Sequence, residues 1–84
     1  MPKLEESPLF GMLQEFVDSL YSAPDQAISR IEVVVAAESF GLNDDLLEIV
    51  NLLPPGTYER ARLCGQFNSS ISSHGWGYYY GTVE

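Results

Sequence analysis

Residues 42–56 read LNDDLLEIVNLLPPG, and the prediction of the whole fold starts from this stretch. Asn43 is a residue type that caps helix N-termini, and the two aspartates after it place negative charge in the first turn, where the helix dipole favours it. Six of the residues in 46–53 are apolar and lie on more than one side of such a helix, which predicts a short, central and largely buried element: Leu46, Leu47, Ile49, Val50, Leu52 and Leu53. The Pro-Pro-Gly at 54–56 ends the helix and is typical of a type II turn.

The segment that begins at Ser7 predicts an amphipathic helix over about residues 8–22. Ser7 is a suitable N-cap, and Pro8 is favourable at the first helical position. Apolar residues then recur at the helical spacing i, i+4, i+7 and i+11: Leu9, Leu13, Phe16 and Leu20. This stripe indicates the face that the helix buries.

Residues 22–41 are predicted to form a second helix. Ser22 and Asp25 are spaced as a capping box, and Gly41 stands where a glycine commonly ends a helix. The apolar stripe of this helix consists of Ile28, Ile31 and Val35. The run IEVVV at 31–35 is β-branched and also suits a buried strand, so whether residues 28–37 are helix or strand stays open.

Beyond the proline turn, Thr57 is expected to cap a helix that ends near Gly75. Its apolar stripe comprises Leu63, Phe67 and Ile71, joined by Tyr58 and Cys64. Gly65 costs a helix interior about 1 kcal/mol relative to alanine. We therefore expect either a close approach by a neighbouring helix at Gly65 or an irregular helix.

Residues 76–83 read WGYYYGTV and alternate with period two, which is typical of a strand. Four of the ten aromatic residues of the chain lie in residues 74–84. A lone strand cannot satisfy its own backbone, so the strand is expected to pair within the chain or with another chain.

Together these elements predict one mainly α domain spanning residues 1–84, in which residues 1–6 are a disordered N-terminus and residues 76–84 a C-terminal strand or tail. Three to four helices form a small bundle with a short C-terminal aromatic β-strand or hairpin, and a winged-helix-like arrangement is a variant. The predicted core consists of Leu9, Leu13, Phe16, Leu20, Ile28, Ile31, Val35, Leu46, Ile49, Val50, Leu53, Leu63, Phe67 and Ile71.

Charge and composition restrict the partners of the chain. Its net charge is −8, and residues 1–56 carry all of it, with ten acidic residues against two basic ones. A field of this sign repels phosphate backbones and anionic membranes and favours basic partners. Cys64 is the only cysteine, and we find neither an export signal nor an apolar run long enough to span a membrane. We therefore expect a cytoplasmic protein without a disulfide.

No motif predicts an enzyme, a cofactor or a metal site. One histidine and one cysteine cannot build a structural zinc site, and no calcium-loop pattern is present. Cys64 and His74 lie ten residues apart on one predicted helix, which separates them by about 15 Å and does not favour a catalytic dyad. We expect Cys64 to be a small buried hydrophobe and His74 to favour the helix C-terminus.

Two functions compete. In the first, the chain is an interaction or regulatory module that contacts a protein partner or a second copy through its C-terminal aromatic residues: Trp76, Tyr78, Tyr79 and Tyr80. In the second, residues 57–73 are the recognition helix of a DNA-binding helix-turn-helix and residues 76–83 its wing. The base-contacting residues would then be Arg60, Arg62, Gln66 and Asn68. Two arginines are few for a phosphate footprint, which favours the first function.

Overall fold

The computed structural model describes residues 10–84, so Ser7, Pro8, Leu9 and the expected disorder of residues 1–6 lie outside the described part. The elements are α1 (Met12–Leu20), β1 (Ala27–Ser29), α2 (Arg30–Phe40), α3 (Asp44–Asn51), β2 (Thr57–Glu59), α4 (Arg60–Ser73) and α5 (Gly77–Tyr80). The fold is thus mainly helical with one small antiparallel sheet, which agrees with the predicted class at that level. No helix within residues 10–84 has the length and apolar character needed to cross a membrane.

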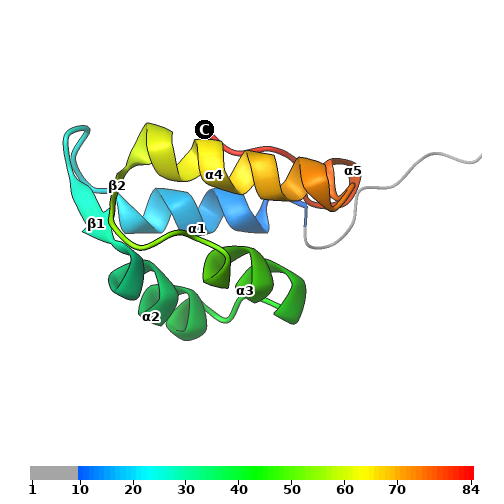
Figure 1. The fold of residues 1–84 in the computed structure, drawn as a ribbon, viewed down its shortest axis with the longest axis horizontal. Helices are drawn as coiled ribbons and strands as arrows, with labels where there is room; N and C mark the ends of the chain where they lie inside the picture. Colours follow the sequence, from blue (N-terminus) through cyan, green and yellow to red (C-terminus); the bar gives the residue numbers. More distant parts are fainter. Residues whose placement is uncertain (1–9) are drawn as a thin grey trace, which may run out of the picture.

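The sheet and α5 lie at opposite ends of the molecule, with the four longer helices between them (Figure 1). Helix α2 packs against both α1 and α3, and α3 packs against α4. Residues 81–84, which we call the closing segment, run back from α5 along α4 (Figure 1).

The two short strands correct the predicted helix starts at Ser22 and Thr57. β1 and β2 are antiparallel, with Ile28 opposite Tyr58, and both of these side chains are buried. Helix α2 instead begins after Ser29, whose hydroxyl accepts a hydrogen bond from the amide of Glu32. Pairing satisfies the backbone of both segments and buries one large side chain from each, which outweighs the local capping preferences.

Residues 28–37, for which helix and strand were both open, contain both structures. The strand ends at Ser29, and the helix begins at the next residue. The buried face of α2 therefore differs from the prediction. Ile31 and Val35 are 70% and 58% exposed, whereas Val33 and Ala37 are fully buried. The predicted stripe was wrong because it treated Ile28, a strand residue, as part of the helix. It therefore assigned the buried side of α2 to the wrong helix face.

The N-cap of the central helix α3 and the glycine that ends α2 agree with the prediction. α3 is capped by Asn43, whose side-chain oxygen accepts from the amide of Leu46. Gly41 ends α2 with a φ of 85°, in the left-handed conformation expected of a terminating glycine. α1 begins after Gly11. No neighbouring atom lies within 4 Å of a Cβ built on Gly65. A close helix approach therefore does not explain that glycine.

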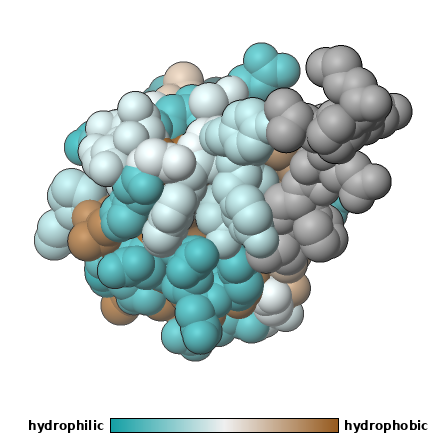
Figure 2. All heavy atoms as spheres, turned by 90° about the vertical axis from the view of Figure 1, so that its right-hand side faces the viewer, coloured by the Kyte–Doolittle hydropathy of each residue, from teal (hydrophilic) through white to brown (hydrophobic). Residues whose placement is uncertain are grey.

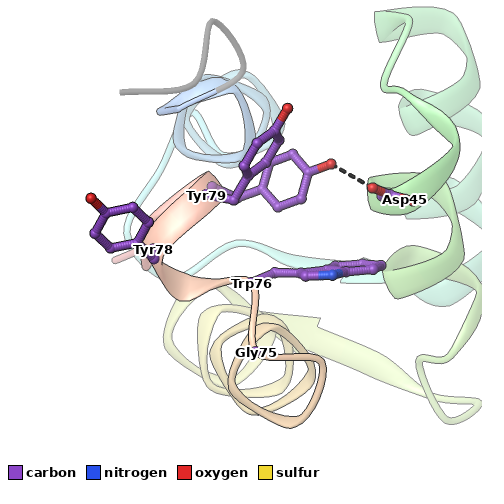
Figure 3. Close-up of a pocket in the computed structure, with 6 residues that line it drawn as sticks. Asp45, Gly75, Trp76, Tyr78 and Tyr79 are labelled. Atoms are coloured by element: carbon purple, nitrogen blue, oxygen red, sulfur yellow. Dashed lines mark hydrogen bonds between the residues drawn. The ribbon is translucent and has the colours of Figure 1, made fainter. Parts of the chain in front are cut away.

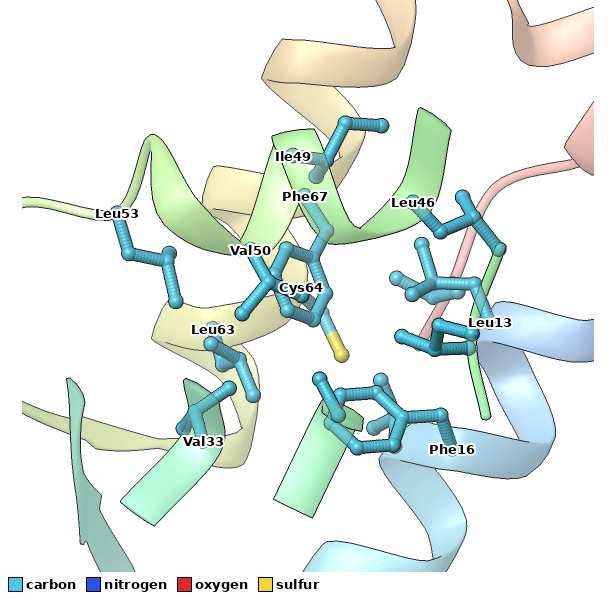
Figure 4. Close-up of a cluster of buried hydrophobic side chains, with 14 of the residues drawn as sticks. Leu13, Phe16, Val33, Leu46, Ile49, Val50, Leu53, Leu63, Cys64 and Phe67 are labelled. Atoms are coloured by element: carbon cyan, nitrogen blue, oxygen red, sulfur yellow. The ribbon is translucent and has the colours of Figure 1, made fainter. Parts of the chain in front are cut away.

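One apolar core joins the helices and the sheet (Figure 4). Ten of the predicted core residues are buried in it: Leu13, Phe16, Ile28, Leu46, Ile49, Val50, Leu53, Leu63, Phe67 and Ile71. Leu20 is only partly buried. Further buried residues that the prediction omitted are Val17, Tyr21, Val33, Ala37, Leu42, Tyr58, Tyr80 and Val83. Cys64 is buried in the core, as expected of a small hydrophobe.

Candidate binding surface at the C-terminal turn

The predicted C-terminal strand is not formed, and residues 77–80 form the one-turn helix α5. Gly75 adopts a φ of 70° and ends α4, and the amide of Trp76 then bonds to the carbonyl of Ile71 at 2.9 Å. The carbonyl of Trp76 in turn accepts from the amides of Tyr79 and Tyr80, both at 2.9 Å. Local hydrogen bonds therefore satisfy this backbone, and the period-two pattern was misleading.

Tyr80 anchors the turn, and it is also one of the residues that line a pocket there. Its side chain is 2% exposed, and its hydroxyl donates to Oδ2 of Asp45 at 2.7 Å while accepting from Nδ2 of Asn43 at 2.9 Å. Burial raises the pKa of the Tyr80 hydroxyl, and the hydrogen bond to Asp45 raises it further. Tyr80, one of the four residues of the predicted interaction surface, is thus largely buried, and it joins α5 to the first turn of α3.

Trp76 forms the inner part of the turn. Its ring is partly buried and packs against the core. It stacks on His74 with 4.4 Å between ring centroids, and Tyr80 meets it nearly at right angles at 5.8 Å. Trp76 is thus held between two neighbours, which fixes its position.

Tyr78 and Tyr79 are the exposed members of the group, at 72% and 49%. With Trp76 and Asp45 they line a pocket of about 380 Å³ between α5 and α3. In Figure 3, Tyr78 lies on the side opposite Asp45, and Trp76 and Tyr79 border the space between them. Figure 2 looks at this end of the molecule, where pale side chains of intermediate hydropathy adjoin strongly hydrophilic ones.

The backbone of the closing segment finds its partners within the chain, in side-chain amides. Asn68 on α4 donates to the carbonyl of Val83 at 2.9 Å and accepts from its amide at 2.8 Å. Gln14 on α1 does the same for Glu84, at 2.8 and 2.9 Å. The side chains of Asn68 and Gln14 therefore bind backbone groups that a neighbouring strand would bind in a sheet.

The four residues of the DNA-binding hypothesis lie on α4, but two of them are engaged within the chain. Arg60 pairs with Asp18 and donates to the main-chain oxygen of Glu84. Both polar groups of the Asn68 amide bind Val83. The guanidinium carbon of Arg62 lies 5.0 Å from the ring centroid of Tyr58, and Gln66 is half-buried.

Two further reactive side chains, Cys64 and His74, lie on α4 and at its C-terminal end. No group of three or more histidine, cysteine, aspartate or glutamate side chains in that range could hold a metal ion. Burial raises the pKa of the Cys64 thiol, which disfavours the thiolate that nucleophilic chemistry needs. His74 places Nδ1 2.7 Å from the carbonyl of Ser70, in the last turn of α4.

Asp45 is the member of the pocket that the sequence did not indicate. In sequence it is one of two aspartates at a helix start, a position that needs no further explanation. Only the packing of α5 onto α3 distinguishes it from Asp44, and no local pattern carries that information. Comparisons of this chain with known protein families, with characterised proteins and with solved structures gave no match.

Proposed function

We propose that this protein is a non-enzymatic binding module that acts through protein–protein contact, with the α5 turn as its contact surface. The observation that carries the proposal is the exposure of Tyr78 and Tyr79 at 72% and 49% on a turn whose other aromatic residues are packed. Tyrosine presents a large contact area with few rotatable bonds, and it is enriched at the energetic centres of interfaces.

The rigidity of the turn supports the same function. Tyr80 is fixed to α3 by two hydrogen bonds, and Trp76 is packed between His74 and Tyr80. A surface that is already ordered loses less conformational entropy when a partner binds. The net charge of −8 favours a basic partner over a second acidic copy of the same chain.

Two observations weigh against DNA binding. The C-terminal residues form a turn and a closing segment in place of the two-stranded wing that the DNA-binding hypothesis requires. Arg60 already pairs with Asp18, and the amide of Asn68 already binds Val83, so contact with DNA would have to break these interactions. We therefore retain protein contact as the proposed function.

Site-specific photo-cross-linking tests this proposal. A photoreactive phenylalanine analogue is placed at position 78 in one sample and at position 35 in another, because both side chains are well exposed. We expect a discrete cross-linked protein from position 78 and none from position 35. Cross-links that form from position 35 and not from position 78 would contradict the assignment of the contact surface.

A further inference from the structure

We propose that the pocket between α3 and α5 takes a guanidinium group, presented by an arginine of the partner protein. This inference rests on the proposed function, and it adds the chemistry by which the partner is recognised. The pocket is lined by the Asp45 carboxylate and by the aromatic rings of the turn. Each of these groups favours a cation, and together they favour a planar one.

The carboxylate has capacity for a ligand. Asp45 is exposed, and Oδ2 accepts the Tyr80 hydroxyl, which fixes the side chain at the edge of the pocket. Among residues 10–84 Asp45 takes part in no ion pair, since the one pair in that range joins Arg60 to Asp18. A ligand cation would therefore meet an oriented carboxylate that the described part of the chain does not already neutralise.

The chain's own arginines are held away from the pocket. Arg30 donates to the main-chain oxygens of Leu53 and Asn51, at 2.7 and 2.8 Å. Arg62 lies over the Tyr58 ring, which is the kind of contact that we propose for the partner's arginine. The pocket thus combines local negative charge with the overall charge of −8, and both attract a basic group.

A guanidinium suits this combination better than the alternatives. It is planar, stacks on aromatic rings, is weakly hydrated and pairs with carboxylates in a fixed geometry. An ammonium is more strongly hydrated and cannot stack. An apolar side chain would take the carboxylate out of water without a partner, and an anion would be repelled.

The single tryptophan of the chain makes the pocket directly observable, because Trp76 lines it. Trp76 fluorescence is titrated with the peptide acetyl-Gly-Arg-Gly-amide. The same titration is run with peptides in which lysine or citrulline, the neutral isostere of arginine, replaces the arginine. We expect a saturable change with the arginine peptide, a weaker one with the lysine peptide and none with the citrulline peptide.

Asp45→Asn is the test variant, and Asp44→Asn is the matched control. The two aspartates are both exposed and adjacent in the first turn of α3, but only Asp45 lines the pocket. Asparagine at position 45 keeps an oxygen that can accept the Tyr80 hydroxyl. We expect Asp45→Asn to weaken arginine-peptide binding about fivefold, as loss of one exposed charge pair does, and Asp44→Asn to have little effect.

Equal responses to the arginine and citrulline peptides would overturn the inference, as would equal responses to the arginine and lysine peptides. Equal weakening by the two variants would also overturn it, because general charge attraction would then explain the binding. If Asp45→Asn fails to fold, the peptide comparison on the wild-type protein still decides. A negative titration together with a cross-link from position 78 would reject the guanidinium site and keep the contact surface.

Discussion

The main-chain groups of Val83 and Glu84, in the closing segment, are bound by the amides of Asn68 on α4 and Gln14 on α1. An amide side chain offers one donor and one acceptor in the same spacing as a peptide group, so it can replace one residue of a neighbouring strand. This arrangement gives hydrogen-bond partners to the backbone of Val83 and Glu84 without a neighbouring strand.

Asn68→Ala should lower the free energy of unfolding by about 1–3 kcal/mol, because the buried backbone of Val83 would lose both of its partners. The neighbouring, exposed Ser69 offers a control, and Ser69→Ala should change stability by less than about 0.5 kcal/mol. Urea unfolding followed by circular dichroism measures both variants. Equal stabilities of the two variants would show that the amide pairing contributes nothing.

The buried hydroxyl of Tyr21 should make the folded protein less stable at alkaline pH. This hydroxyl donates to the carbonyl of Tyr58 at 2.8 Å, and burial raises its pKa from 10.0 to about 12. Because the unfolded chain releases this proton first, the free energy of unfolding should fall as pH rises from about 10 to about 12, by up to about 1.4 kcal/mol per pH unit.

Tyr21→Phe should make this fall less steep, whereas Tyr78→Phe, which removes an exposed hydroxyl, should not. Denaturant unfolding at several pH values between about 9 and about 12 gives the slope for each protein. A slope that Tyr21→Phe leaves unchanged would refute the role of this hydroxyl.

At the scale of the elements, α2 provides the sharpest test of the packing, because it carries valines on opposite faces. Val33 is fully buried and Val35 is 58% exposed. Val33→Ala should cost about 2 kcal/mol through lost burial and a residual cavity, and Val35→Ala less than about 0.5 kcal/mol. Chemical denaturation of the two variants compares them directly. A larger loss for Val35→Ala would favour the helix face predicted from the sequence.

The elements that the sequence predicted correctly depend on local chemistry. Asn43 caps α3, and Gly41 and Gly75 end the helices before them. A capping side chain and a left-handed glycine depend only on residues a few positions away, so the local sequence is enough to predict them. The two strands depend on contact between segments thirty residues apart. No local signal distinguishes Ile28 at a strand centre from Ile28 on a helix, so the prediction followed the caps.

The C-terminal turn illustrates the same limit. Alternating aromatic and glycine residues indicate a strand only if a partner strand is available. In this fold Tyr80 is instead inserted beside α3, where Asp45 and Asn43 bind its hydroxyl. All four predicted contact residues line the pocket. Tyr78 and Tyr79 are exposed, Trp76 is partly buried, and Tyr80 also belongs to the core.

At the scale of the whole molecule, the chain keeps its sheet at one end and its aromatic turn at the other (Figure 1). In the function that we propose, the field of the acidic residues attracts a basic partner, and the turn supplies the short-range contacts. Composition indicated the acidity, and the order of the residues indicated the aromatic cluster. Neither could indicate that α3 contributes Asp45 to the same surface, because that contact exists only once the helices have packed.

The proposal that the α5 turn binds a protein partner is best examined by measuring the dissociation constant of the cross-linked partner for three forms of the protein. These are the wild type, the double variant Tyr78→Ser with Tyr79→Ser, and the control Ile31→Ser with Val35→Ser, which removes exposed apolar residues from α2. We predict that the tyrosine variant raises the dissociation constant about tenfold or more, as loss of interface hot spots does, while the control leaves it unchanged. An unchanged constant for the tyrosine variant, or a rise confined to the α2 variant, would contradict the claim.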